Sequence, residues 1–199
     1  MDTQNNNQEL TERLKLIESM IAEGRRSTRH WGWTFVLWGV AYLVATAWAS
    51  WTMSWAAWPV TMTVAGVLTW VIASRTTRGY PETALGRAIG AVWTAMGCSL
   101  MVILVCLSVA GHYDGHVFVA VVGAMLATAH ATSAIMLKWK AQLWCALVWL
   151  AAGVAACFGS DQVVAIAFLG ATFLGQIVFG IYAMILEARD RKPSGAVNV

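Results

Sequence analysis

The chain has 199 residues, of which 59% are hydrophobic and only 12% are charged, and its formal net charge is +3. A soluble domain carries about 25% charged residues. The shortfall excludes an ordinary soluble globular protein and indicates lipid as the solvent, and the modest positive charge is no signature of nucleic-acid binding.

The N-terminal segment combines a polar start with an amphipathic pattern. Residues 1–8 are rich in Asn and Gln, and we expect them to be disordered. From Gln8 to about Arg29 the sequence predicts a helix, interrupted at Gly24, because apolar residues recur at helical spacing on one face. That face consists of Leu10, Leu14, Ile17 and Ile21. We interpret it as a surface for a protein partner; lying on the membrane and packing beneath the bundle are the other two options.

Six stretches are long and apolar enough to cross a membrane as helices, which takes roughly 20 residues each. Their predicted bounds are Trp33–Trp51, Trp58–Ser74, Ala88–Ala110, Val117–Leu137, Gln142–Phe158 and Gln162–Leu186. The connections between them are short. The chain therefore divides into a cytosolic segment (1–30), a six-helix transmembrane bundle (31–187) and a cytosolic tail (188–199). The predicted fold class is an all-α polytopic membrane protein.

The 13 Lys and Arg residues predict the orientation of the bundle. They lie before the first span, in the second and fourth connections and after the sixth span, and the other connections contain none. Because positive charge is retained in the cytoplasm, we expect both termini on the cytoplasmic side of an inner (cytoplasmic) membrane.

Small residues spaced four apart line several spans, and such ridges let helix backbones approach closely in lipid. The ridges comprise Ala41, Ala45 and Ala49; Ala91, Ala95 and Ser99; Gly123, Ala127 and Ala131; and Ala152 and Ala156. They predict a tight bundle. No proline lies in the interior of a span, so the broken helices typical of secondary transporters are not indicated.

Tryptophan is frequent, with 12 residues in the chain. A group of them crowds the outer end of the first helical hairpin: Trp48, Trp51, Trp55 and Trp58. Amphipathic indole rings prefer the lipid headgroup layer, so we interpret this group as an interfacial belt in contact with membrane lipids. The alternative is an outer groove that binds a lipid or lipid-like ligand.

Two polar residues lie inside spans at nearly the same predicted depth, His130 in the fourth span and Gln176 in the sixth. The simplest interpretation is that each is satisfied by a neighbouring helix. Two alternatives stay open for His130: a ligand- or proton-handling role, and a haem or metal site with mixed ligands or ligands shared in a dimer. Ligation of haem by two histidines of one chain is excluded, because no second His lies inside a span.

The connection 111–116 is the densest polar cluster on the predicted outer side, and it holds the weak metal candidates His112, Asp114 and His116. Imidazole and carboxylate groups bind zinc, but Asp-Gly is also an ordinary turn dipeptide. The four cysteines lie within spans without metal-binding spacing, as buried apolar residues do. We therefore predict no cofactor and no catalytic residue.

The stretches Leu14–Ile21 (LKLIESMI), Trp33–Gly39 (WTFVLWG) and Gly86–Trp93 (GRAIGAVW) resemble a family of small uncharacterised bacterial inner-membrane proteins. Members of that family have a short cytosolic helix followed by a multi-span bundle. The resemblance implies this architecture, but neither an activity nor site residues.

From these features we predict a non-catalytic interaction or regulatory component of a membrane complex. Its expected partners are membrane lipids and a protein on the cytosolic side, with formation of a homo-oligomer as a further option. The first alternative is a small transporter, or a transporter subunit, for an uncharged or lipid-like solute. The second is a metal- or haem-dependent membrane protein.

Overall fold

The computed structural model describes residues 2–53, 56–76, 84–111 and 114–190, and every regular element in these ranges is helical. The elements are α1 (Asp2–His30), α2 (Gly32–Thr52), α3 (Ala57–Thr76), α4 (Ala84–Val109), α5 (Gly115–Leu137), α6 (Lys140–Phe158), α7 (Asp161–Thr172), the π-helix η1 (Phe173–Val178) and α8 (Phe179–Asp190). Six helices are long and apolar enough to cross a membrane: α2 to α6, and the continuous helix that α7, η1 and α8 form. The predicted all-α class and the six predicted spans are confirmed.

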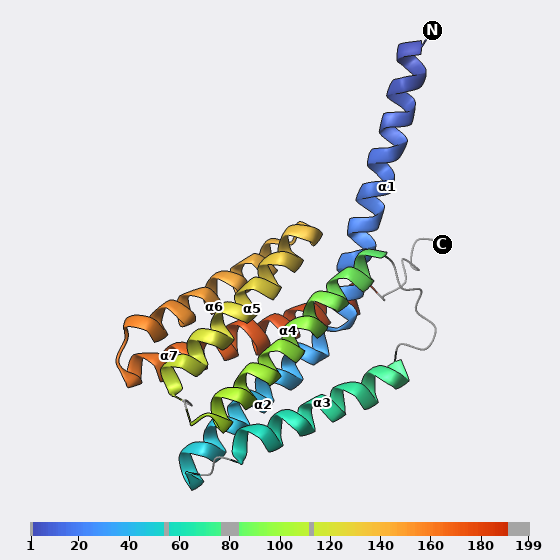
Figure 1. Cartoon of the computed structure of the whole chain (residues 1–199). Coiled ribbons are helices and arrows are strands. Elements are labelled where there is room, and N and C mark those ends of the chain that lie inside the picture. Colours follow the sequence, from blue (N-terminus) through green and yellow to red (C-terminus); the bar gives the residue numbers. More distant parts are fainter. Residues whose placement is uncertain (1, 54–55, 77–83, 112–113, 191–199) are drawn as a thin grey trace.

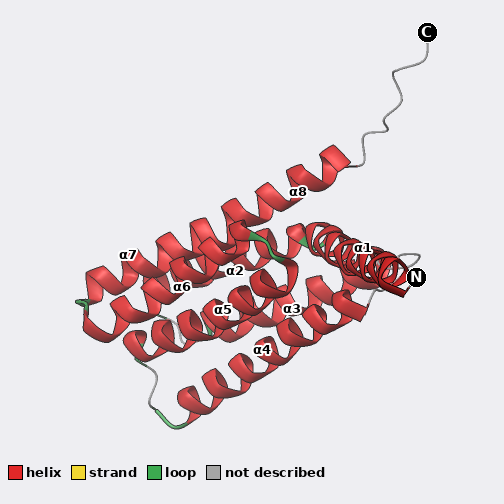
Figure 2. Cartoon of the chain, turned by 90° about the horizontal axis from the view of Figure 1, so that it is seen from above, coloured by secondary structure: helices red, strands yellow, loops and turns green. Residues whose placement is uncertain are grey.

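The six spans lie side by side, and α1 projects from one end of them (Figures 1 and 2). At the same end lie the last residues of α3 and α5 and the first residue of α6, with Arg75, Lys138 and Lys140. We name this the basic end of the bundle. The opposite end holds the start of α5 and the α6–α7 connection.

The helix α1 is longer and more continuous than the sequence predicts. It begins at Asp2 and passes through Gly24 without a break, so the disorder expected for 1–8 is wrong for residues 2–8. Gly24 has a packing role instead, because a Cβ atom there would lie 2.7 Å from Leu85 Cδ2 and 2.9 Å from Leu137 Cδ2. Glycine thus lets α1 touch the ends of α4 and α5.

The core of the bundle is the antiparallel pair α5 and α6. A Cβ atom on Gly123 of α5 would lie 2.8 Å from the backbone oxygen of Trp149 and 2.9 Å from Cα of Gly153, both on α6. The backbones therefore touch directly, as the small-residue ridge predicts. In the apolar 18-residue stretch of each span, 56% of the residues of α5 are buried, against 17% for α3 and 11% for α4. Those two spans lie at the periphery.

The predicted ridge on α4 does not pack: its three residues, Ala91, Ala95 and Ser99, are exposed. The reason is that α4 turns a different face to the bundle and buries Ile89 and Leu100. In lipid a peripheral helix gains packing enthalpy from large side chains as well as from small ones, so small residues four apart do not by themselves identify the packed face.

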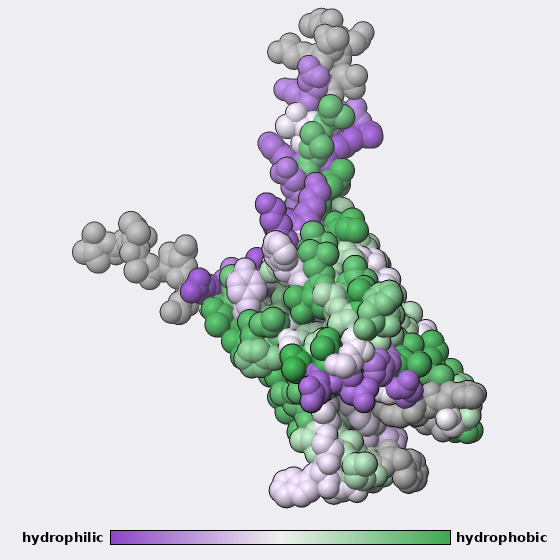
Figure 3. Space-filling view, turned by 90° about the vertical axis from the view of Figure 1, so that its left-hand side faces the viewer, coloured by the Kyte–Doolittle hydropathy of each residue, from purple (hydrophilic) through white to green (hydrophobic). Residues whose placement is uncertain are grey.

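A second close crossing joins α2 to α8 and η1. A Cβ atom on Gly180 would lie 2.7 Å from the backbone oxygen of Gly32, and one on Gly39 would lie 2.7 Å from Ile177 Cγ1. Large apolar side chains on the faces of the spans that point away from the bundle are exposed. Apolar colour covers most of the bundle surface that is visible in Figure 3. That surface is suited to lipid.

We expect Gly123→Ala to destabilise the protein, because the added methyl group meets backbone atoms that cannot move aside. Overpacking of this kind costs about 1–3 kcal/mol. The matched control is Gly97→Ala on α4, where a Cβ atom meets nothing within 4 Å. Thermal unfolding in detergent should show a lower midpoint for the first variant only; equal midpoints would contradict the direct backbone contact.

Candidate functional site

Polar side chains are buried inside the apolar bundle, on four different elements. They are His130 and Ser133 on α5, Gln142 on α6, Thr172 on α7 and Gln176 on η1, each 0–2% exposed. A buried polar group without a hydrogen bond is costly, so the partners of these groups decide what the cluster can do. We name these five residues the buried polar cluster.

His130 lies among aromatic rings. Its imidazole stacks on Phe35 with ring centroids 5.6 Å apart, and it meets Trp93 and Phe179 edge-on at 4.9 and 5.7 Å. The indole nitrogen of Trp93 donates to Ser133 Oγ at 3.0 Å. Trp93 therefore links the two α5 members of the cluster, whereas neither ring nitrogen of His130 has a hydrogen-bond partner among the described residues.

Gln176 belongs to a π-helical segment that interrupts the sixth span. The N–H of Phe179 bonds to the oxygen of Leu174, five residues earlier, as a π-helix requires. Gln176 Cβ packs against α2 at Gly39, since a Cβ atom added to that glycine would lie only 3.0 Å from it. Gly39 follows Phe35 by one turn, so α2 contacts both His130 and Gln176. Single π-helical turns within α-helices are frequent at functional sites.

Trp149 of α6 packs against the π-helix η1 at Gly175. A Cβ atom on Gly175 would lie 2.6 Å from Trp149 Nε1, so only glycine admits the indole edge. That Nε1, both amide atoms of Gln142 and the hydroxyl of Thr172 are buried without a partner in the described part of the chain. The cluster therefore offers donors and acceptors that no residue of the described chain uses.

The four residues predicted to bind a partner lie on α1. Leu10, Leu14 and Ile17 are 59%, 55% and 52% exposed, and Ile21 is half-buried nearer the bundle. Polar and apolar side chains share the projecting helix in Figure 3. The first three residues of the predicted stripe therefore form an exposed surface, which extends over about two helical turns.

Contacts at the base of α1 hold it to the bundle. Arg25 Nε donates to the backbone oxygen of Leu137, at the C-terminus of α5, at 2.6 Å. Arg29 pairs with Asp190 of α8 and lies 5.9 Å from the centroid of the Trp139 ring, and His30 Nδ1 lies 2.9 Å from Glu187 Oε1.

Only Trp31 separates α1 from α2, and its N–H bonds to the oxygen of Thr28 at 3.2 Å. The connection is therefore a single hydrogen-bonded turn. The direction of α1 is fixed by this turn and by contacts to α5 and α8.

The predicted tryptophan belt divides in the structure. Trp51 is 90% exposed and Trp48 is 37% exposed, as expected of rings at an interface. Trp58 turns inward, with its ring 4.5 Å from that of Phe118 and 6.2 Å from that of Tyr42. Trp55 lies outside the described residues, so the four rings are not shown as one groove.

At the end opposite α1, His116 joins two helices. Its Nε2 lies 2.8 Å from Asp161 Oδ1 of α7, and its Nδ1 lies 2.9 Å from the backbone oxygen of Ala156 on α6. Asp114 caps α5 by accepting from the N–H of His116 at 2.9 Å. His112 lies outside the described residues, and within the described ranges no three His, Cys, Asp or Glu side chains form a metal-binding group.

Sequence reasoning found His130 and Gln176 but missed Thr172, Gln142 and the π-helix. The π-helix depends on a change of hydrogen-bond register within the sixth span, for which the pattern of apolar residues gives no signal. The sequence places Gln142 at the start of a span, where a polar side chain reaches the headgroup layer. In the structure Gln142 lies in the first turn of α6, which begins at Lys140, and its side chain is completely buried.

We expect His130→Phe to keep or raise the thermal unfolding midpoint, because replacing a buried polar group that lacks a partner by an apolar ring of similar shape is nearly neutral or stabilising. The neighbouring aromatic rings suit a phenyl group. Ser133→Ala, which deletes a bond that is made, should lower stability by about 1 kcal/mol. A clear loss of stability in His130→Phe would reveal a hydrogen bond to His130.

No known protein family, curated protein or solved structure matches the chain. The resemblance to a family of small bacterial inner-membrane proteins therefore stays a prediction. By the length and hydropathy of its helices, the chain is a multi-pass membrane protein with six candidate spans.

Proposed function

We propose that the protein is a non-catalytic interaction or regulatory component of a membrane complex, with α1 as the element that binds a protein partner. The observation that carries the proposal is the exposed apolar stripe of Leu10, Leu14 and Ile17 on a helix that projects beyond the bundle. Apolar residues at this spacing are what a helix uses to bind the groove of a partner.

The charge of the stripe's surroundings supports a protein rather than a membrane surface as the partner. Residues 2–23 contain five acidic residues and two basic residues, a net charge of −3. Anionic lipid headgroups would repel that segment, whereas helices that bind membrane surfaces are rich in Lys and Arg.

The base of α1 supports a regulatory role. Arg25, Arg29 and His30 contact α5 and α8, so a partner on the stripe is mechanically connected to the spans. The proposal includes the orientation expected from the basic residues, with both termini and α1 on the cytoplasmic side of an inner membrane.

We expect Leu14→Asp combined with Ile17→Asp to abolish partner binding while the bundle remains folded, because both side chains are more than half exposed. The measurement is purification of the full-length tagged protein in mild detergent, with quantitative mass spectrometry of what is retained. The matched control is Gln8→Asp combined with Thr11→Asp, which adds the same two negative charges on the polar face of the same helix.

A protein recovered in stoichiometric amount with the wild type and the control, but lost from the stripe variant, would support the proposal. Equal recovery with all three proteins would place the partner elsewhere on the molecule. Absence of any stoichiometric protein would contradict the proposal itself.

A second candidate function is passage of a small uncharged solute, and the buried polar cluster favours it. His130, Gln142 and Thr172 have unpartnered groups, and Thr172 directly precedes the π-helical turn, so these groups are suited to bind a polar solute inside the bundle. In proteoliposomes, uptake of glycerol or urea would exceed that of protein-free vesicles, and Gln176→Leu would return it to the background. Equal uptake with and without protein would exclude this function for those solutes.

A further inference from the structure

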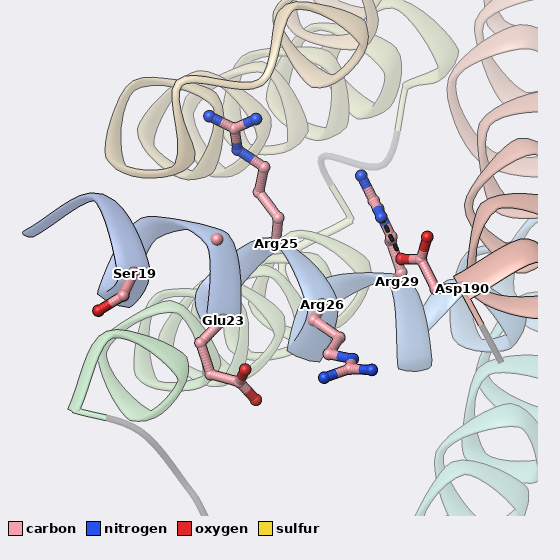
Figure 4. A pocket seen from close by; sticks show the side chains of 7 residues that line it. Ser19, Glu23, Arg25, Arg26, Arg29 and Asp190 are labelled. Atoms are coloured by element: carbon pink, nitrogen blue, oxygen red, sulfur yellow. Dashed lines mark hydrogen bonds and ion pairs between the residues drawn. The ribbon is translucent and has the colours of Figure 1, made fainter. Parts of the chain in front are cut away.

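The basic end of the bundle has a recess at the foot of α1, separate from the apolar stripe. Its volume is about 360 Å³, and it is lined by Ser19, Arg25, Arg26, Arg29 and Asp190, with Ala22 and Glu23. Figure 4 shows Arg25 and Arg26 projecting to opposite sides of α1, with Arg29 and Asp190 together at one end and Ser19 at the other. We propose that this recess binds a phosphate group, carried either by a phospholipid or by a soluble phosphorylated compound.

The first argument is the supply of unused donors. Arg26 makes no hydrogen bond or ion pair with any residue that the structure describes, and Arg29 Nε is buried without an acceptor in the same part of the chain. Arg25 uses Nε for Leu137 and keeps its two terminal nitrogens. Guanidinium groups bind phosphate oxygens through pairs of parallel N–H bonds, and Arg26, whose nitrogens are all unused, supplies such a pair.

The second argument is charge. The recess has three arginines and two carboxylates, a net charge of +1. Asp190 is already paired with one nitrogen of Arg29, which leaves Glu23 as the group that opposes an anion. Ala22 lies about one turn before Arg25 and Arg26 on α1, and its small side chain leaves room above the helix for the phosphate.

The third argument is position. Arg29 lies 5.9 Å from the Trp139 ring, and Trp139 directly precedes the apolar helix α6. Tryptophan at the end of a span is typical of the headgroup layer, and basic recesses between helices at that level bind anionic headgroups. A phosphate of a lipid in the surrounding leaflet would therefore lie at the right depth, as would a soluble phosphate compound entering from the aqueous side.

The test is a titration of the full-length protein in neutral detergent, with the thermal unfolding midpoint as the readout. A short-chain phosphatidylglycerol below its critical micelle concentration, a short-chain phosphatidylcholine and inorganic phosphate are added separately. We expect a saturable rise of the midpoint. A rise with phosphatidylglycerol but not with inorganic phosphate assigns the site to a lipid; a rise with inorganic phosphate assigns it to a soluble compound.

Four variants make the result specific. Arg26→Gln should weaken the apparent affinity about tenfold or more by removing charge-assisted bonds. Ala22→Leu should do the same without changing charge, because it fills the floor of the recess. Glu23→Gln should tighten binding by removing the opposing carboxylate. Arg13→Gln, which removes the same charge from the same helix outside the recess, should leave the affinity unchanged.

Two results would overturn the proposal. One is the absence of a saturable shift with phosphatidylglycerol and with inorganic phosphate. The other is a shift that Ala22→Leu leaves intact, or that Arg13→Gln reduces as much as Arg26→Gln does, because binding would then follow the general charge of the surface. Arg26, Ala22 and Arg13 are exposed, so the variants test binding rather than folding.

Discussion

Direct contact between helix backbones, made at glycine, is the interaction on which the rest of this bundle depends. In a membrane, an apolar side chain gains little free energy by moving from lipid into a helix interface. Helices therefore associate through close packing and hydrogen bonds. Gly123 and Gly153 bring α5 and α6 together, and Gly32 and Gly180 bring α2 and α8 together. These two crossings hold the aromatic rings around His130 in place, because Phe35 and Phe179 belong to the second crossing and His130 to the first.

The number and bounds of the spans could be predicted because each depends on a local property, a run of apolar residues of sufficient length. The packed ridges of α2, α5 and α6 could also be predicted from small residues four apart. The ridge of α4 could not, because which face of a peripheral helix meets the bundle depends on its neighbours. Gly24 shows the same limit: its local effect is to weaken a helix, but its contacts with Leu85 and Leu137 decide its role.

The candidate sites divide in a similar way. His130 and Gln176 stand out in the sequence because polar residues are rare in apolar spans. Thr172 and the π-helix do not stand out, since one depends on neighbouring helices and the other on a change of hydrogen-bond register. The recess at the foot of α1 was also missed, because Arg25, Arg26 and Arg29 already had an explanation as a topology signal. In the structure Arg25 bonds to the end of α5 and Arg29 pairs with Asp190 of α8, whereas Arg26 has no partner among the described residues.

The single-residue connection at Trp31 gives α1 a mechanical property. The helix α1 has 29 residues, and the part before Gly24, residues 2–23, is an arm about 33 Å long. Its base is tied to α2 through Trp31 and to α8 through Arg29 and His30. A rotation of about 5° at the base moves the tip of this arm by about 3 Å, whereas atoms at the pivot stay in place. Small changes in how α2 crosses α8 are therefore amplified along α1 into movements large enough to change what its far end can touch.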